Sequence, residues 1–174
     1  MACPSINTKM IVYLTRRYRF CASHRLHNEA LSDEDNLRIY GKCDSRFGHG
    51  HNYVLEVTVQ GPIDQQTGMV FDLAALDGIV EKEVLERFDH TNLNLDVEDF
   101  RSRVPTTENV CERIFHLLED KLEGGGPLHA ASLARVRLEE TSSNFFEYEG
   151  EPDVSTHPSL EDNLPRPLLT KEAS

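Results

Sequence analysis

The chain contains no tryptophan, only four cysteines among 174 residues, and no long apolar run. The four cysteines stand at unrelated spacings, without a C-x-x-C pair or a secretory leader, so a disulfide framework is not expected. Nothing approaches the ~20 consecutive apolar residues of a membrane span. These absences predict a soluble cytoplasmic protein whose thiols are reduced.

Basic residues are also scarce, because 18 Lys and Arg face 30 Asp and Glu, giving a formal net charge of -12. This balance excludes nucleic acid or an anionic membrane as the main partner, since both require clustered positive charge. The deficit is uneven, however. Residues 1–53 hold eight basic and five acidic residues. A small polyanion could bind this basic third, although a solvated basic face is the simpler interpretation for any one residue.

Hydrophobic patterning predicts a single α+β domain over residues 9–150, with a flexible segment 1–8 before it and a disordered, proline-rich acidic tail over 151–174 after it. The expected elements are, in order, a strand over 9–24, a long loop over 25–48, a strand over 52–60, helices over 72–88 and after Pro105, and strands over 132–141 and 145–148. This order, β-β-α-α-β-β, indicates helices covering one face of a sheet.

A histidine pair follows the long loop. In an extended chain, His49 and His51 project from the same side, with Gly50 between them. His24 ends another expected strand and could bring a third imidazole alongside, although His27 competes for that place. Three imidazoles and one open position describe a catalytic zinc site.

Cys43 lies six positions before His49 in the segment GKCDSRFGHGHNY. As a fourth ligand it would close the metal site and make it structural, whereas as a thiolate near the metal it would be a chemical reagent. A third interpretation, that of a small buried side chain, suits Cys21 and Cys111 better because they fall in an expected strand and helix.

Two further positions break local rules. Asp89 and His90 directly follow the first helix, where an acid can orient an imidazole that transfers protons, although a solvated helix end is equally compatible. Glu140 stands on the apolar parity of ARVRLEET, so its carboxylate needs a partner or a ligand with adjacent N–H donors. Exposure at the strand end is the alternative.

Five motifs occur in order along residues 11–151: CASHRLH, GKC-x5-HGHNY, FDHTNLN, PTTENV and LEETSSN. Together they resemble the 6-pyruvoyltetrahydropterin synthase family. The resemblance implies the T-fold, a four-stranded antiparallel sheet with two helices on one face. It also implies that three subunits form a barrel, that two barrels stack into a homohexamer, and that the active sites lie at subunit interfaces.

The same resemblance implies a zinc-dependent lyase that converts 7,8-dihydroneopterin triphosphate to 6-pyruvoyltetrahydropterin, on the route to tetrahydrobiopterin, with release of triphosphate. The implied roles are Zn²⁺ binding by His24, His49 and His51, proton abstraction by Cys43, a relay by Asp89 and His90 with which Glu140 is also grouped, pterin anchoring by Glu140, and pterin contacts by Thr106 and Thr107. The basic residues between Arg16 and Arg46 could attract the triphosphate.

Two alternatives stay open. The related 6-carboxytetrahydropterin synthases resemble C-x3-HGH in this loop, whereas this chain has C-x5-HGH, which favours the pyruvoyl reaction. A non-catalytic zinc-binding module, closed by Cys43, is the other alternative. One departure from the family is the segment DSRF, which places Asp44 beside Cys43 and would oppose thiolate formation if the two side chains were close.

Overall fold

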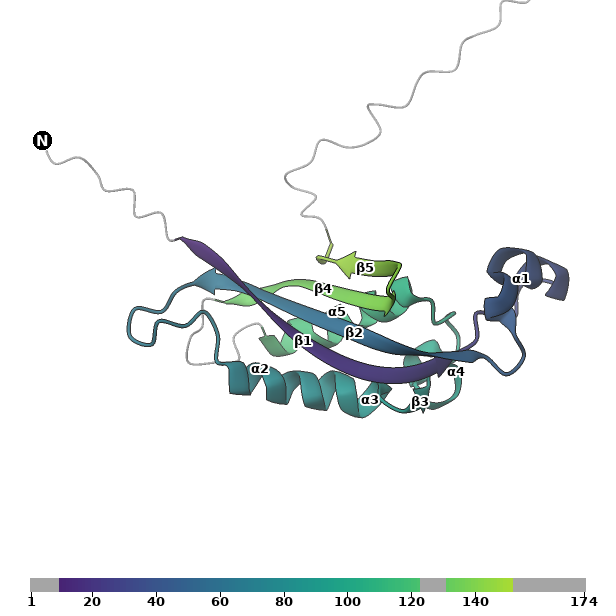
Figure 1. Cartoon of the computed structure of the whole chain (residues 1–174), viewed down its shortest axis with the longest axis horizontal. Coiled ribbons are helices and arrows are strands. Elements are labelled where there is room, and N and C mark those ends of the chain that lie inside the picture. Colours follow the sequence, from purple (N-terminus) through teal and green to yellow (C-terminus); the bar gives the residue numbers. More distant parts are fainter. Residues whose placement is uncertain (1–9, 123–130, 152–174) are drawn as a thin grey trace, which may run out of the picture.

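The computed structural model describes residues 10–122 and 131–151 (Figure 1). The expected N-terminal segment 1–8, residues 123–130 between the second helix and the strand that follows it, and the tail after residue 151 therefore lie outside the described residues. The predictions for these segments stay predictions.

The sheet has five strands in the order β3-β1-β2-β4-β5. Their bounds are β1 Ile11–His24, β2 His49–Pro62, β3 Thr91–Asn92, β4 Ser132–Thr141 and β5 Asn144–Tyr148. The four longer strands pair antiparallel, while β3 pairs parallel with β1 through Ala22 and Ser23. The expected four-stranded, wholly antiparallel sheet is thus corrected to a five-stranded mixed one. The fifth strand arises because the chain that leaves the helix ending at Phe88 runs for two residues along the outer edge of β1.

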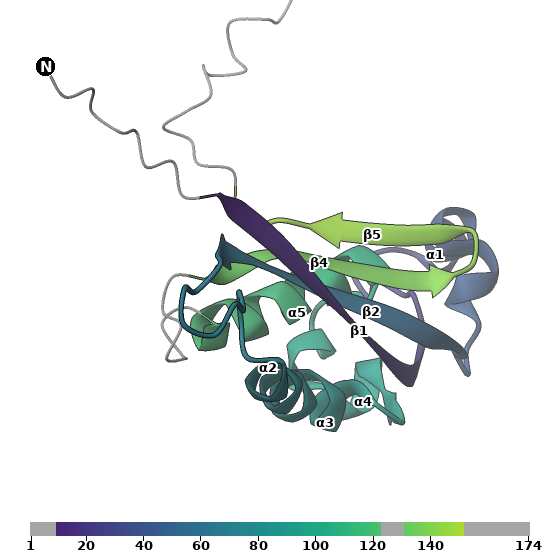
Figure 2. The same ribbon diagram turned by 60° about the vertical axis from the view of Figure 1, so that its left-hand side comes forward.

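The helices lie on one side of the sheet, except for α1, which projects beyond one end of β1 and β2 (Figures 1 and 2). Their bounds are α1 Asp33–Tyr40, α2 Leu73–Val80, α3 Glu86–Phe88, α4 Leu93–Asp96 and α5 Thr107–Leu122, with single turns η1 Gly41–Asp44, η2 Glu81–Leu85 and η3 Glu98–Phe100. The π-helical turn η2 joins α2 to α3, so the helix expected over 72–88 is present with a local widening. Asp72 caps it by accepting from the Ala74 and Ala75 amides.

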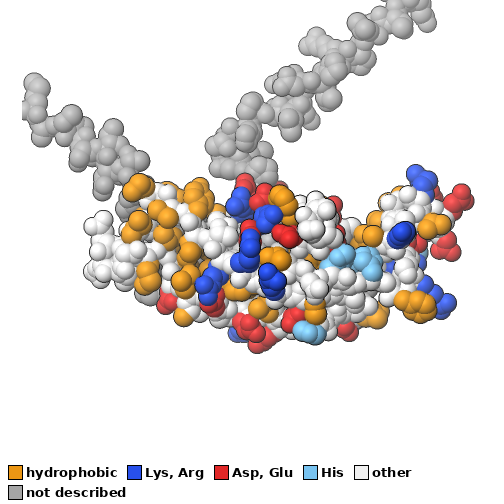
Figure 3. Space-filling view, in the orientation of Figure 1, with side chains coloured by type: hydrophobic (Ala, Val, Ile, Leu, Met, Phe, Trp, Pro, Cys, Tyr) orange, Lys and Arg blue, Asp and Glu red, His pale blue; other side chains and the backbone are white. Residues whose placement is uncertain are grey.

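The core lies between this helical layer and the inner sheet face. Leu55, Val57 and Leu138 are fully buried on the sheet side, and Leu76 and Ile114 are fully buried on the helices. Because side chains alternate along a strand, the other parity faces outward, where acidic and basic side chains are interspersed (Figure 3). That outer face carries an ion-pair ladder of Arg17, Glu56 and Arg137.

The long loop expected over residues 25–48 is instead partly helical, because it contains α1. Ser32 caps this helix by accepting from the Asp35 amide, and three acidic residues follow in its first turn, where they favour the helix dipole. Asn36 is fully buried within it. Its amide group donates to the carbonyls of Asn28, Leu31 and Ser32 and accepts from the Asn28 amide, which fixes the loop to the helix. These short-range polar contacts have no hydrophobic period, and so the helix was not expected.

Candidate functional site

Three imidazoles meet where β1 ends and β2 begins. His24 pairs with His49 across the two strands, and Ala22 pairs with His51, so all three histidines stand on the inner sheet face. The Nε2 atoms of His24 and His49 are 3.1 Å apart, and one ring nitrogen from each histidine lies within 4.8 Å of the other two. The structure therefore brings together the three residues that the strand parity grouped. On the face shown in Figure 3, histidine side chains gather toward the end of the molecule where α1 lies.

Hydrogen bonding and burial prepare these rings for a metal ion. The Nδ1 atom of buried His24 lies 2.8 Å from the Pro105 carbonyl, so Nδ1 carries the proton and Nε2 keeps its lone pair. Burial and then the neighbouring imidazoles lower the pKa of His24, and burial lowers that of His51. Two buried ring nitrogens, His49 Nδ1 and His51 Nε2, have no hydrogen-bond partner among the described residues. Neutral imidazoles with unused nitrogens suit Zn²⁺.

Glu140 of β4 points to the same place. Its Oε1 atom lies 3.6 Å from His51 Nε2 and 3.8 Å from His24 Nε2. Burial opposes ionisation of this carboxyl, but hydrogen bonds from Thr107 Oγ1 at 2.5 Å and Asn144 Nδ2 at 3.0 Å, together with the imidazoles, hold its pKa below the ordinary value. Its position on the apolar parity is explained by these partners, and an ionised carboxylate faces the imidazoles.

The start of α5 forms the neighbouring wall. Thr107 is its first residue and is buried, with its hydroxyl bonded to Glu140. Thr106 caps the helix, because its hydroxyl oxygen accepts a hydrogen bond from the Asn109 amide. The carbonyl of Pro105, the preceding residue, is the one that orients His24. The PTTENV segment thus connects the helix start to both the imidazoles and the carboxylate.

Tyr53 was not singled out from the sequence, although it ends the HGHNY motif. Its ring centroid lies 5.6 Å from that of His51. Its side chain is buried, and within residues 10–122 and 131–151 no hydrogen-bond partner reaches its hydroxyl. Burial raises the pKa of this hydroxyl, which therefore stays protonated and able to donate. Its parity with His49 and His51 was the signal in the sequence.

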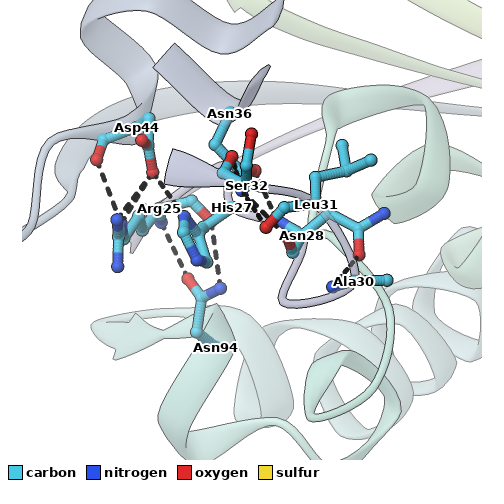
Figure 4. Close-up of polar contacts among 9 residues, drawn as sticks. All are labelled: Arg25, His27, Asn28, Ala30, Leu31, Ser32, Asn36, Asp44 and Asn94. Atoms are coloured by element: carbon cyan, nitrogen blue, oxygen red, sulfur yellow. Dashed lines mark hydrogen bonds and ion pairs between the residues drawn. The ribbon is translucent and has the colours of Figure 1, made fainter. Parts of the chain in front are cut away.

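Cys43 and Asp44 lie in the turn η1. Figure 4 shows Asp44 beside Arg25 and His27. The Cys43 carbonyl accepts from the Leu26 amide at 2.9 Å. Asp44 Oδ1 accepts from Arg25 at 2.7 Å and lies 2.7 Å from His27 Nδ1. Arg25 thus compensates the charge of the Asp44 carboxylate. His27 therefore contacts Asp44 and is not a member of the group formed by His24, His49 and His51.

Asp89 and His90 form an acid–imidazole pair, with Asp89 Oδ2 2.9 Å from His90 Nδ1. Their metal-ligand atoms group with the thiol of Cys21, and Cys43 is in neither of the two such groups found among the described residues. The interpretation of Cys21 as a buried hydrophobe is therefore wrong, because this side chain is only partly buried and has polar neighbours. That interpretation is confirmed for Cys111, which lies in the core, where burial raises the pKa of its thiol to about 12.

A hollow of 750 Å³ lies next to the histidine strands and is lined in part by basic side chains, namely Arg25, Arg46, Arg101 and Arg103. Three of them have acidic partners, since Arg25 binds Asp44, Arg101 binds Glu98 and Arg103 binds Glu112. Arg46 has no acidic partner within residues 10–122 and 131–151, and its guanidinium lies over the Phe47 ring. Three of the four arginines that line the hollow are therefore compensated by acidic residues of the same chain.

An α+β scaffold that places neutral imidazoles, an ionised carboxylate and an acid–histidine pair at one end of its sheet is typical of an enzyme. A sequence profile of the 6-pyruvoyl tetrahydropterin synthase family matches residues 13–151. The chain belongs to this family. Within the described part of the chain, no helix is both long and apolar enough to cross a bilayer.

Individual relatives agree with the family match. The 6-pyruvoyl tetrahydrobiopterin synthase of Homo sapiens is 45% identical over 138 residues, which is 79% of this chain and 91% of the human one. That of Drosophila melanogaster is 42% identical over 140 residues, 80% of each chain. The solved structure of the Caenorhabditis elegans 6-pyruvoyl tetrahydropterin synthase has a TM-score of 0.75 and 43% identity, and covers 82% of this chain and 97% of that one. The likeness supports the T-fold that the motifs imply.

Proposed function

We propose that the chain is a zinc-dependent 6-pyruvoyltetrahydropterin synthase, a lyase that converts 7,8-dihydroneopterin triphosphate to 6-pyruvoyltetrahydropterin and releases triphosphate. The observation that carries the proposal is the cluster of His24, His49 and His51 with Glu140 at its edge. The three imidazoles would hold the Zn²⁺ ion. When bound, the ion would acidify the substrate side-chain hydroxyls and stabilise the oxyanions formed as protons leave.

Glu140 would anchor the pterin. Each of its oxygens accepts one hydrogen bond from the described residues, and a carboxylate oxygen can accept a second one. An ionised carboxylate matches the paired N–H donors of the guanidine-like edge of the ring. Thr107 fixes the carboxylate orientation, and Thr106 lies at the same helix start, where a pterin contact is proposed.

Cys43 would act as the base that removes a side-chain proton, with Asp89 and His90 as its relay. Within one chain the relay pair groups with Cys21 instead. We therefore place the complete catalytic set at an interface between subunits. Two open sheet edges support such assembly, since β3 covers only Ala22 and Ser23 of β1, and β5 ends the sheet on the other side. A homohexamer and a cytoplasmic location are part of this proposal.

The hollow beside the histidine strands is a candidate for the triphosphate, because Arg46 has no acidic partner among the described residues and faces it. Replacing Arg46 by Ala should raise KM for dihydroneopterin triphosphate while leaving the zinc content unchanged. Arg17, which pairs with Glu56 on the outer sheet face, offers the matched control. An unchanged KM in Arg46→Ala would remove this hollow from the substrate site.

One experiment separates the proposed function from its alternatives. In Cys43→Ser, zinc should stay bound while turnover of dihydroneopterin triphosphate falls by roughly 100-fold or more, as expected for loss of a general base. Loss of zinc from this variant would favour a non-catalytic module closed by Cys43. Formation of carboxytetrahydropterin and acetaldehyde by the wild-type protein would instead favour the 6-carboxytetrahydropterin reaction, against which the C-x5-HGH spacing argues.

A further inference from the structure

The backbone of Cys21 makes two hydrogen bonds to the segment that follows α3, one to a side chain and one to the main chain. The Cys21 amide donates to Asp89 Oδ1 at 2.8 Å, and the Cys21 carbonyl accepts from the His90 amide at 2.7 Å. Cys21 and His90 immediately precede Ala22 and Thr91, which are paired in the parallel β1–β3 ladder. The thiol is thus fixed beside an imidazole and a carboxylate by main-chain contacts.

The ligand atoms of this group are close enough to share one ion. One atom each from Cys21, Asp89 and His90 lies within 4.8 Å of the others. Asp89 Oδ2 and His90 Nδ1 are 2.9 Å apart. The hydrogen bond from the Cys21 amide, and after it the contact with His90, lower the pKa of Asp89, although partial burial opposes this shift. A negative charge is therefore already present beside the thiol.

The group is also accessible. The His90 side chain is 80% exposed, although its backbone adopts the left-handed conformation at φ 58°, which an L residue rarely adopts. Cys21 and His90 line an open depression of 450 Å³ that His51 also borders. In the single chain, an ion from solvent can reach all three side chains without a rearrangement of the core.

We propose that Cys21, Asp89 and His90 form a second divalent-metal site for a thiophilic ion such as zinc or cadmium, separate from the three-histidine cluster. A thiolate and an imidazole favour such ions over Mg²⁺ or Ca²⁺. Binding releases the thiol proton to solvent, after which the thiolate and the carboxylate together neutralise the 2+ charge. Three protein ligands leave a fourth position for water or for another ligand.

The site has a consequence that rests on the proposed function. If Asp89 and His90 are the proton relay, an ion bound to them prevents proton transfer. Zinc would then be required at the histidine cluster and inhibitory in excess. Binding itself does not depend on the reaction, so a binding measurement tests the site even if the proposed substrate is wrong.

Cobalt provides the probe, because a thiolate bound to Co²⁺ gives a near-ultraviolet charge-transfer band that imidazole and carboxylate ligands do not. In the metal-free full-length chain, the first equivalent of Co²⁺ should bind without this band, and the second should produce it. In Cys21→Ser the band should disappear, and the affinity for the second ion should fall by roughly 100-fold or more, since even outer-shell partners are worth 10–100-fold. The first equivalent should bind as before.

Two further variants keep the test decisive. His90→Asn removes the imidazole while placing at φ 58° a residue that tolerates this conformation, and it should weaken the second ion as Cys21→Ser does. Cys43→Ser should keep the band. A band that survives in Cys21→Ser, or one that appears with the first equivalent and is lost in Cys43→Ser, would overturn the proposal. Binding of only one Co²⁺ ion by the wild-type chain would do the same.

Discussion

His24 is the most enclosed member of the histidine cluster, and its burial couples stability to pH. Burial and then the two neighbouring imidazoles lower its pKa below the ordinary 6.5, so the folded chain resists a proton that the unfolded chain accepts. The metal-free protein should therefore lose stability as the pH falls from 6.5 toward the lowered folded-state pKa, and keep it above 6.5.

Thermal melts of metal-free protein at about pH 7.5 and about pH 5.5 measure this effect. In His24→Asn the amide group can still donate to the Pro105 carbonyl, but no proton is taken up near neutral pH, so the melting temperature should change less between the two conditions. A smaller dependence of the melting temperature on pH should persist in this variant, because the pKa of His51 is also lowered. An equal change in melting temperature between the two pH values for wild type and His24→Asn would contradict the assignment of the pH dependence to His24.

Glu140 is expected to matter through its charge. Glu140→Gln preserves its size and one carbonyl acceptor for Thr107 but removes the ionised oxygen pair that faces the imidazoles. We expect turnover to fall by roughly 100-fold or more, with a fold and zinc content like those of the wild type. Glu139→Gln on the opposite strand parity is the matched control, because Glu139 lies near Arg137 on the outer face. Equal activity of both variants would exclude Glu140 as the anchor.

At the residue scale, strand parity was sufficient to group His24, His49 and His51, since alternation assigns a side chain to a face without further information. Parity also placed Glu140 on the inner face, where its hydrogen bonds with Thr107 and Asn144 explain it. The relation of Cys21 to His90 could not be predicted, because it depends on a two-residue parallel pairing between residues 69 positions apart.

At the scale of elements, one glycine sets how β2 starts against β1. Gly48 has φ 69°, and a Cβ atom there would lie 2.5 Å from the His24 carbonyl oxygen. Gly68 has nearly the same φ, 72°, but nothing within 4 Å of such an atom. Gly68→Ala should therefore cost only the left-handed backbone penalty of ~1–2 kcal/mol, whereas Gly48→Ala should cost more and displace His24 and His49.

Urea denaturation of both variants gives the two free energies of unfolding, and zinc titration shows whether the cluster is disturbed. Zinc affinity should fall in Gly48→Ala and stay unchanged in Gly68→Ala, because Gly68 lies in the turn beyond the other end of β2. Two equal losses of stability with unchanged zinc affinity would show that the close approach at Gly48 is relieved elsewhere.

The elements that were predicted from sequence are those with a clear hydrophobic period, namely the long strands, the helix after Asp72 and α5. The elements of the described chain that were missed are short and depend on polar contacts. They are α1, which Ser32 and Asn36 define, β3, which pairs with Ala22 and Ser23 of β1, and α4, which Asn92 caps. Hydrophobic patterning reports burial, and these segments bury little, so their positions follow from hydrogen bonds that only the folded chain shows.

At the scale of the molecule, the unpaired edges of β1 and β5 suggest that the described sheet continues into other copies of the chain. The proposed homohexamer predicts a particle six times the 19.8 kDa mass of one chain in sedimentation velocity. A proline at Tyr13, which is exposed on the uncovered part of β1, should weaken assembly if this edge pairs with a neighbour. The control is Leu37→Ala, at an exposed position on α1, which should leave the mass of the particle unchanged. Proline is not used at Leu37 because it would break the helix.

The family match ends at residue 151, which separates the catalytic unit from the remaining 23 residues of the chain. A chain that ends at residue 151 should therefore assemble as the full chain does and convert dihydroneopterin triphosphate at the same rate per subunit. All residues proposed to bind zinc, pterin or protons precede this point, so their geometry does not require the removed segment. Sedimentation velocity and steady-state turnover, measured on both chains at equal zinc content, test the expectation. A truncated chain that no longer assembles would mean that the segment contributes to the interfaces, whereas intact assembly with altered KM would indicate that it reaches the substrate.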